Sequence, residues 1–320
     1  MDSNTSAGNP LVTVVTITYN SSSYVRDAIE SVLAQSYTNI EYVIGDDCST
    51  DDTWQIIQEY DDYRIIAYRN ESNVREYANR NKAINKAKGK YLIFIDGDDV
   101  IYPHGLDFMV RMLEAFPASA MAIMRPYHSK IIYPVELNPY TLFLAEYFHK
   151  SLLDTAFTNT FFKLSILKGF GGLSEKYAAG DNYIRLKIAK ENNCLLINDN
   201  LTWWRETPGQ AFQRLSNTVY GFLQAFNVKI EMLDENCPFT AEEKVLATKN
   251  VQRKVVIDAL KMVGKGEVLK GLQILISSNL IRKVVPLLFS KYKKIDPFFN
   301  YSAVNPIRLS YDFNPFARKK

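Results

Sequence analysis

The chain has 320 residues, 47% hydrophobic and 23% charged, with a formal net charge of +3 at pH 7. This is the composition of a globular protein that buries one large core or two modest ones. Three cysteines, at positions 48, 194 and 237, are too far apart to suggest a metal site, and the scattered histidines argue against zinc chemistry. No run of 18 apolar residues and no signal-peptide pattern is found, so we expect a cytoplasmic protein.

Positive charge gathers at the C-terminal end. From Arg282 to Lys320, nine Lys or Arg face two Asp, a balance of +7. Such a tail favours an anionic partner, and a solvated charged face would explain it equally well. The segment from 272 to 294 combines apolar and basic residues, which predicts peripheral contact with an anionic membrane, on its inner face. A terminal helix packed on the rest of the protein fits the same pattern.

Strands and helices alternate from the N-terminus. Apolar runs predict strands over 11–18, 40–45, 64–68 and 90–95, the first of them rich in β-branched residues. Helical spacing predicts helices over 24–33 and 76–88. A capping box of Ser49 and Asp52 predicts another helix after it, and Pro103 predicts one that begins there. Gly89 occupies the place of a left-handed residue that ends a helix. Because the strands are apolar throughout, the pattern predicts an α/β fold with a mostly parallel, helix-covered sheet.

Polar residues follow three of these strands. Asp96, Asp98 and Asp99 end the run that begins at Lys90, and Asp46–Asp47 and Tyr19–Asn20 end two others. Ligands of parallel sheets bind at the carboxyl ends of the strands, so we expect these residues on a common rim. Closely spaced carboxylates suit Mg²⁺ or Mn²⁺ carrying substrate phosphates. A simple turn after a strand would also begin with Asp-Gly.

These pieces, in this order, resemble the family 2 glycosyltransferases of the GT-A fold, which are inverting and use nucleotide sugars. The matching segments are Val14–Asn20, Asp46–Asp51, Arg80–Asn81 with Ala87–Gly89, Asp96–Asp99, Gly171–Gly172 and Gly180–Asp181. The resemblance covers about residues 11–210. It implies a Rossmann-like nucleotide-binding half over 11–117, an acceptor-binding half over 118–215, and a mainly helical extension with a basic tail over 216–320. Residues 1–10 are expected to be a flexible N-terminus.

The resemblance also implies roles for the donor-side residues. Asp98 would contact the ribose of a UDP-sugar or share the metal with Asp99, while Asp96 supports that loop. Asp47 would accept the uracil N–H, with Asp46 beside it at the strand end. The remaining donor contacts would come from Thr18 and Tyr19 at the base and from Arg80 at the nucleotide or diphosphate. Helix capping by the Asp pair, and a surface charge at position 80, stay open as alternatives.

Asp181 is the expected general base. It follows Gly180, where the family commonly has Glu, so only the second acid of that pair is present. One carboxylate beside an acceptor hydroxyl is sufficient for in-line displacement with inversion; capping of a helix is the alternative. Trp203–Gln210 resembles the family's closing loop, with Arg205 near the diphosphate, and Gln210–Leu215 departs from the motif of processive synthases.

The predicted function is therefore the metal-dependent transfer of a single sugar to a saccharide or lipid-linked acceptor in surface-polysaccharide assembly. A nucleotidyltransferase is the rival enzyme class, although no Gly-rich basic loop follows the first strand. A nucleotide-binding protein with a degenerate site is the non-enzymatic rival. No nucleic-acid partner is expected, and a homodimer stays open.

Overall fold

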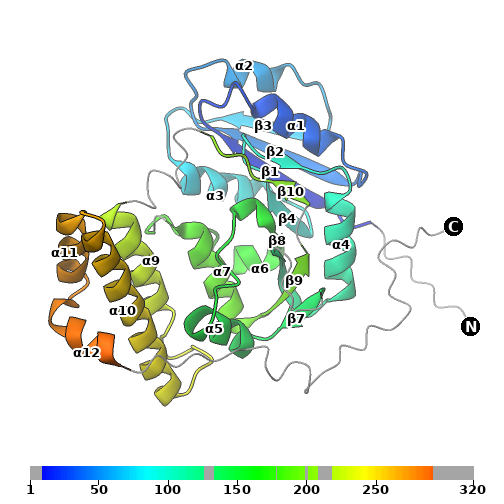
Figure 1. The fold of residues 1–320 in the computed structure, drawn as a ribbon. Coiled ribbons are helices and arrows are strands. Elements are labelled where there is room, and N and C mark those ends of the chain that lie inside the picture. Colours follow the sequence, from blue (N-terminus) through cyan, green and yellow to red (C-terminus); the bar gives the residue numbers. More distant parts are fainter. Residues whose placement is uncertain (1–8, 126–132, 178, 199–200, 208–217, 291–320) are drawn as a thin grey trace, which may run out of the picture.

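The computed structural model describes residues 9–125, 133–177, 179–198, 201–207 and 218–290 (Figure 1). The first half contains β1 (Val12–Thr18), α1 (Val25–Leu33), β2 (Ile40–Asp46), α2 (Thr53–Gln58), β3 (Ile65–Arg69), α3 (Glu76–Lys86), β4 (Tyr91–Phe94), β5 (Val100–Ile101) and α4 (Gly105–Ala115). The second contains β6 (Ser119–Arg125), β7 (Val135–Leu137), α5 (Pro139–Phe148), η1 (Phe157–Asn159), β8 (Thr160–Lys163), α6 (Leu164–Gly169), α7 (Gly180–Glu191), β9 (Asn193–Asn198) and β10 (Thr202–Trp203). The C-terminal part contains α9 (Val219–Glu231), α10 (Ala241–Gly264), α11 (Val268–Ser277), η2 (Ile281–Lys283) and α12 (Val284–Phe289).

One eight-stranded sheet forms the centre, in the order β3-β2-β1-β4-β8-β6-β9-β7. Strands β3, β2, β1 and β4 are parallel to one another, and β6 is parallel to β9. Strand β8 is antiparallel to both of its neighbours, and β7 is antiparallel to β9. The predicted α/β fold with a mostly parallel sheet is confirmed.

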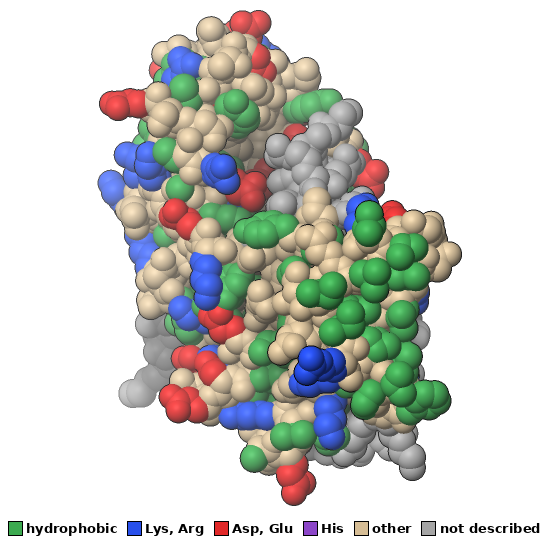
Figure 2. All heavy atoms as spheres, turned by 90° about the vertical axis from the view of Figure 1, so that its left-hand side faces the viewer, with side chains coloured by type: hydrophobic (Ala, Val, Ile, Leu, Met, Phe, Trp, Pro, Cys, Tyr) green, Lys and Arg blue, Asp and Glu red, His purple; other side chains and the backbone are tan. Residues whose placement is uncertain are grey.

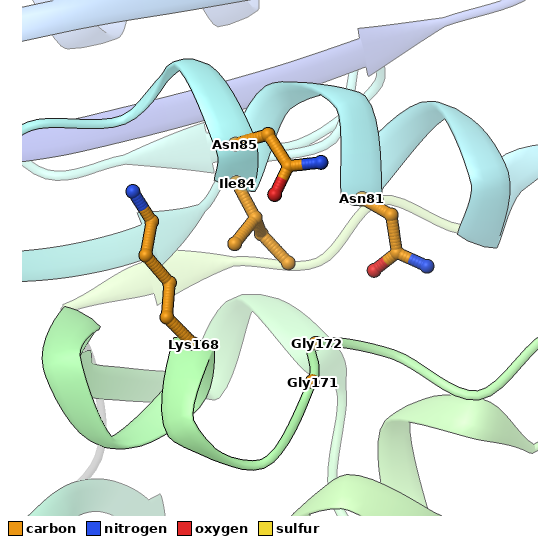
Figure 3. A pocket seen from close by; sticks show the side chains of 6 residues that line it. All are labelled: Asn81, Ile84, Asn85, Lys168, Gly171 and Gly172. Atoms are coloured by element: carbon orange, nitrogen blue, oxygen red, sulfur yellow. The ribbon is translucent and has the colours of Figure 1, made fainter.

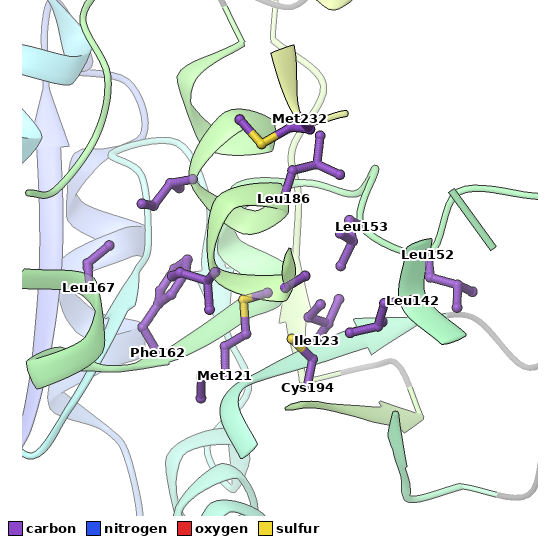
Figure 4. Close-up of a cluster of buried hydrophobic side chains, with 14 of the residues drawn as sticks. Met121, Ile123, Leu142, Leu152, Leu153, Phe162, Leu167, Leu186, Cys194 and Met232 are labelled. Atoms are coloured by element: carbon purple, nitrogen blue, oxygen red, sulfur yellow. The ribbon is translucent and has the colours of Figure 1, made fainter. Parts of the chain in front are cut away.

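Helices cover both faces of the sheet, as the apolar strands require. Alternate residues of β4 enter two different cores: Leu92 and Phe94 face one, and Tyr91 and Ile93 face the other. Residues of α1 and α4 complete the second core. Figure 4 shows the first core, where side chains of α5 and α7 and Met232 meet those of β6, β8 and β9.

Two local predictions are wrong. Helix α3 ends at Lys86, Ala87 is extended, and Gly89 is not left-handed. Glycine is needed at position 89 because a Cβ would lie 2.6 Å from the Thr13 nitrogen of β1. The expected capping box is absent too, since the Ser49 hydroxyl donates to Asp46 Oδ1 at 2.5 Å.

The C-terminal part is helical, as predicted, and it continues the core of the rest. Val228, Met232, Phe239 and Ala247 belong to the first core. Beyond them, the end of α10 forms a separate small core with α11 and α12. The predicted boundary at residues 215 and 216, residues 1–8 of the N-terminus and the basic tail over 291–320 lie outside the described residues.

Within the described part of the chain, no single helix has both the length and the apolar character needed to cross a membrane.

Candidate active site

The carboxyl ends of β1, β2 and β4 bring the predicted polar residues to one edge of the sheet. Thr18 and Asp46 are opposite each other in the register of β1 and β2. The Gly97 nitrogen, beyond β4, donates to the Ile17 carbonyl at 3.2 Å. The acid loop after β4 therefore begins beside the end of β1, on the rim that the topology predicts.

Asp46 is fully buried, and its carboxylate is bonded to the protein itself. It accepts hydrogen bonds from the Thr18 hydroxyl at 3.1 Å and from the Ser49 nitrogen at 3.1 Å. Arg69 Nε lies 3.3 Å from its Oδ2. Thr18 and Asp46 thus fix the loop after β2 rather than present their side chains to an incoming ligand.

Asp47 is also buried, with 4% of its surface exposed. Its Oδ1 accepts from Asn70 Nδ2 and the Val74 nitrogen, and its Oδ2 from the Arg75 nitrogen, each at 2.9 Å. A carboxylate has about four acceptor positions. One position, on Oδ2, is left for a further donor once these three bonds are made.

Tyr19 lies at the tip of β1 with half of its surface exposed. The turn behind it is held by Asn20, which has a φ of 52° and whose Oδ1 accepts from the Thr50 nitrogen at 2.8 Å. The ring of Tyr19 therefore offers an open flat surface beside the acid rim.

The acid loop, Asp96–Asp99, is held on two sides. Arg80 Nη2 of α3 lies 2.7 Å from both oxygens of Asp96. The Asp98 carboxylate accepts from the Thr207 hydroxyl at 2.9 Å. Asp99 is 1% exposed, and burial together with the Asp96 carboxylate raises its pKa to about 8. The raised pKa reflects the crowding of acidic side chains at this loop.

Arg205 covers the acid loop. Its backbone nitrogen donates to Asp99 Oδ1 at 3.0 Å, and its Nε donates to the Asp98 carbonyl at 2.8 Å. Its Nη2 forms an ion pair with Asp27 of α1 at 2.7 Å, and its guanidinium lies 4.6 Å from the centre of the Trp203 ring. Strand β10, just before Arg205, pairs with β5, just after the acid loop, and this pairing holds Arg205 beside the loop. The rest of the expected closing loop, 208–217, lies outside the described residues.

Asp181 lies in the first turn of α7, and its Oδ2 accepts from Arg185 Nη2 at 2.9 Å. Its side chain is 26% exposed. Burial raises the pKa of Asp96 in spite of Arg80, and the charges of Asp98 and Asp181 add to this effect. Asp181 therefore lies within electrostatic range of the acid loop.

A buried ring connects the two sides of the site. The guanidinium carbons of Arg80 and Arg185 lie 5.2 Å and 5.7 Å from the centre of the Phe157 ring. Asp96, Arg80, Phe157, Arg185 and Asp181 thus form one continuous series of contacts. Sequence reasoning missed Phe157 and Arg185; the spacing of Asp181 and Arg185, four residues apart on a helix, was the available signal.

The glycine before Asp181 has a steric reason. A Cβ on Gly180 would lie 2.7 Å from the Ser174 carbonyl and 3.1 Å from the Tyr77 ring. Tyr77 thus occupies the space in which a larger side chain at position 180 would begin.

A separate surface pocket of about 410 Å³ lies between α3 and the turn after α6 (Figure 3). It is lined by Asn81, Ile84, Asn85, Lys168, Gly171 and Gly172. No carboxylate is among these residues, so this pocket is distinct from the acid rim.

The acid loop offers few ligands of its own to a divalent cation. Among the described residues, no three His, Cys, Asp or Glu side chains are grouped so that they could hold an ion by themselves. Asp98 and Asp99 supply hard oxygen donors and leave most coordination positions to other ligands. They fit a Mg²⁺ or Mn²⁺ ion that arrives with substrate phosphates.

Known sequences resemble the first half of the chain. Residues 13–170 match the family described as Glycosyl transferase family 2. The chain is 40% identical over 121 residues to the "Putative teichuronic acid biosynthesis glycosyltransferase TuaG" of Bacillus subtilis, covering 36% of this chain and 48% of the relative. It is 44% identical over 89 residues to the "UDP-Glc:alpha-D-GlcNAc-diphosphoundecaprenol beta-1,3-glucosyltransferase WfaP" of Escherichia coli, covering 28% of this chain and 36% of the relative. The chain spans less than half the length of these curated relatives.

Two solved structures share the fold. S. aureus TarS 1–349 in complex with UDP-GlcNAc has a TM-score of 0.61 at 18% identity, covering 76% of this chain and 71% of that one. The mannosyltransferase PcManGT from Pyrobaculum calidifontis, in complex with GDP-Man and Mn²⁺, has a TM-score of 0.56 at 17% identity and covers 89% of both chains. The GT-A type of fold is thereby confirmed. Residues 13–170 therefore form a domain of glycosyl transferase family 2.

Proposed function

We propose that this protein transfers a single sugar from a UDP-sugar to a hydroxyl of a saccharide or lipid-linked saccharide, in the assembly of a cell-surface polysaccharide. The observation that carries the proposal is the pairing of the acid loop with Asp181 through Arg80, Phe157 and Arg185. A donor site and a proton acceptor are the two parts that such a reaction needs.

The donor would lie along the rim. Tyr19 offers its exposed ring to the base, and Asp47 has one acceptor position left for an N–H. Asp98 and Asp99 would hold Mg²⁺ or Mn²⁺, which neutralises the diphosphate when it is bound. Arg205 and Arg80 hold the acid loop in place, and Thr18 and Asp46 support the loop under the base.

Asp181 would act as the general base. The acceptor oxygen attacks the anomeric carbon as the bond from that carbon to the phosphate oxygen breaks, so that UDP leaves with the electron pair. The acceptor proton passes to the Asp181 carboxylate. Attack opposite the leaving group inverts the anomeric configuration, and no second carboxylate is needed as a nucleophile.

The names of the relatives support the substrate classes. The E. coli relative is named for UDP-Glc and a diphosphoundecaprenol-linked acceptor, and the B. subtilis relative for teichuronic acid biosynthesis. TarS was solved with UDP-GlcNAc, whereas PcManGT was solved with GDP-Man. The choice of uracil for this chain rests on Asp47.

Calorimetry separates the candidate functions. We expect UDP to bind more tightly with Mn²⁺ present than with EDTA, and more tightly than GDP or CTP. Preference for CTP would instead support the nucleotidyltransferase. A panel of nucleotide sugars should then give metal-dependent UDP release with one of them.

Two substitutions test the assigned roles. Asp181→Asn should lower kcat by about 10²- to 10⁴-fold, the usual contribution of a general base, while UDP affinity is kept. Asp99→Ala should instead lower UDP affinity in the presence of Mn²⁺. Asp107→Asn, on the exposed side of α4, serves as a control and should change neither quantity. If UDP binds but no nucleotide sugar is turned over by the wild-type protein, the non-catalytic binding protein is correct.

A further inference from the structure

Helices α11 and α12 expose a band of large apolar side chains, here called the apolar band. It consists of Val268, Leu269, Leu272, Ile276, Ile281, Val285 and Phe289, with Leu269 and Phe289 each 84% exposed. Figure 2 shows hydrophobic side chains gathered on this part of the molecule. Exposed apolar patches of this kind mark interaction surfaces on monomeric proteins.

The apolar band is not needed for the folding of these helices. Their core contacts come from other residues: Ile274 and Leu275 of α11 and Leu287 of α12 are buried against α10. Gly271 brings the backbones together, since a Cβ there would lie 2.6 Å from the Ala259 carbonyl. The outward side chains of α11 and α12 are therefore left for another contact.

Exposed basic residues lie in the same stretch of the chain as the apolar band. Lys265, Lys270, Arg282 and Lys283 are exposed between residues 264 and 289, and Glu267 is the single acid in that stretch of the sequence. Lys291, Lys293 and Lys294 follow in the sequence. Apolar side chains together with Lys and Arg match the chemistry of an anionic lipid surface.

The geometry favours a position along a bilayer rather than across it. The segments Val268–Ser277 and Ile281–Phe289 are apolar enough together to span a membrane but are bent by 96°. A helix of ten residues is about 15 Å long, half of the roughly 30 Å hydrocarbon thickness. Each helix can therefore lie in the interface with its apolar side chains buried.

We propose that the apolar band, together with Lys265, Lys270, Arg282 and Lys283, forms a membrane-binding surface for an anionic bilayer. A second copy of the chain is the less suitable occupant, because a twofold contact through this face would bring two positively charged faces together. The surface lies outside the active site, so this proposal does not depend on the proposed reaction.

Flotation of the full-length chain with vesicles tests the proposal. We expect binding to vesicles that contain phosphatidylglycerol and much weaker binding to pure phosphatidylcholine. The double variant Leu269→Ser/Phe289→Ser should lower the bound fraction about tenfold or more, consistent with about 0.8 kcal/mol for each buried CH₂. The variant Lys270→Gln/Arg282→Gln/Lys283→Gln should weaken binding most at low salt. Val245→Ser, 55% exposed on α10, is the matched control and should bind like the wild type.

A reporter side chain separates the membrane from other occupants. Trp fluorescence of Phe289→Trp, measured as the difference from wild type, should be quenched by vesicles with brominated acyl chains. Emission that is already blue-shifted and unchanged by vesicles would mean that the chain itself or a second copy covers the band. That result overturns the proposal, as does equal flotation of the wild type and the apolar double variant. A dimer that dissociates on Leu269→Ser while vesicles bind neither protein overturns it too.

Discussion

Two arginines that carry their charge inside the protein set the geometry of the active site. The side chains of Arg80 and Arg185 are 9% and 1% exposed, and each forms an ion pair with an acid of the site. Arg185 also donates to the Thr155 carbonyl at 2.9 Å and contacts the Phe157 ring. Since buried guanidinium groups are costly unless several partners satisfy them, these contacts fix the position of Asp181 more firmly than a helix terminus alone would.

Arg185→Lys should therefore act as a positioning variant. A lysine keeps the charge but cannot serve Asp181, Thr155 and the Phe157 ring together. We expect kcat to fall by about 10- to 100-fold, as small misplacements of a reacting group cause, with UDP affinity unchanged. Steady-state kinetics and UDP calorimetry on the same samples measure the two effects.

Arg111→Lys is the control for that variant, because Arg111 forms an exposed ion pair with Asp107, also four residues apart on a helix. It should leave kcat unchanged. An equal loss of UDP affinity and kcat in Arg185→Lys would show general misfolding instead of a positioning role.

At the scale of elements, the turn between α6 and α7 is fitted to α3 through one side chain. Asn81 of α3 donates to the Leu173 carbonyl at 2.9 Å and accepts from the Leu173 nitrogen at 2.8 Å. Gly171 and Gly172 both have positive φ angles, of 82° and 76°. A Cβ on Gly172 would lie 2.6 Å from Asn81 Oδ1, whereas one on Gly171 would meet open space.

These neighbouring glycines form a matched pair for measurement. Gly171→Ala should lower the free energy of unfolding by only about 1 kcal/mol, because alanine disfavours a positive φ. Gly172→Ala should cost about 2–3 kcal/mol, since Asn81 must also move and lose its hydrogen bonds to Leu173. Urea unfolding of both variants gives the difference, and equal losses would mean that Asn81 shifts without cost.

The order of the elements explains how much could be predicted from the sequence. The runs that became β1, β2 and β4 are largely apolar, and acids follow two of them, so the rim was predictable from local sequence patterns. Strand β8 was not, because only four residues, Thr160–Lys163, lie antiparallel between β4 and β6. Phe157 precedes β8 directly, so its contacts with both arginines depend on a placement that no local pattern indicates.

At the scale of the whole molecule, the helical C-terminal part is joined to the rest through a buried charge. Glu146 of α5 lies 2.6 Å from Lys229 Nζ of α9, and its Oε1 accepts from the Leu152 and Leu153 nitrogens at 2.6 Å and 2.9 Å. Burial alone would raise the pKa of Glu146, but Lys229 and these hydrogen bonds hold it below the usual value. The ionised form of Glu146 therefore stabilises the docking of α9.

The sign of the pH dependence follows. A lowered pKa in the folded state stabilises the protein above the unfolded value of about 4.3, and this contribution is lost as the pH falls below it. Glu146→Gln should lower the free energy of unfolding by about 1–3 kcal/mol at pH 7, with the difference from wild type shrinking below about pH 4. Urea unfolding as a function of pH measures this difference. Glu242→Gln, exposed on α10, is the control. A difference between Glu146→Gln and wild type that is constant with pH would refute the stabilising role of ionised Glu146.

The cover of the acid loop comes from far along the chain: Arg205 and Thr207 reach loop residues 106 and 109 positions earlier in the sequence. On the ribosome, the three aspartates leave the exit tunnel long before Arg205 and Thr207. A fragment ending at residue 170, where the family match ends, contains every acid of that loop and neither of these two contacts. Such a fragment carries the motif by which the family is recognised, yet it lacks the covering residues and Asp181, so the signature is complete earlier in synthesis than the site.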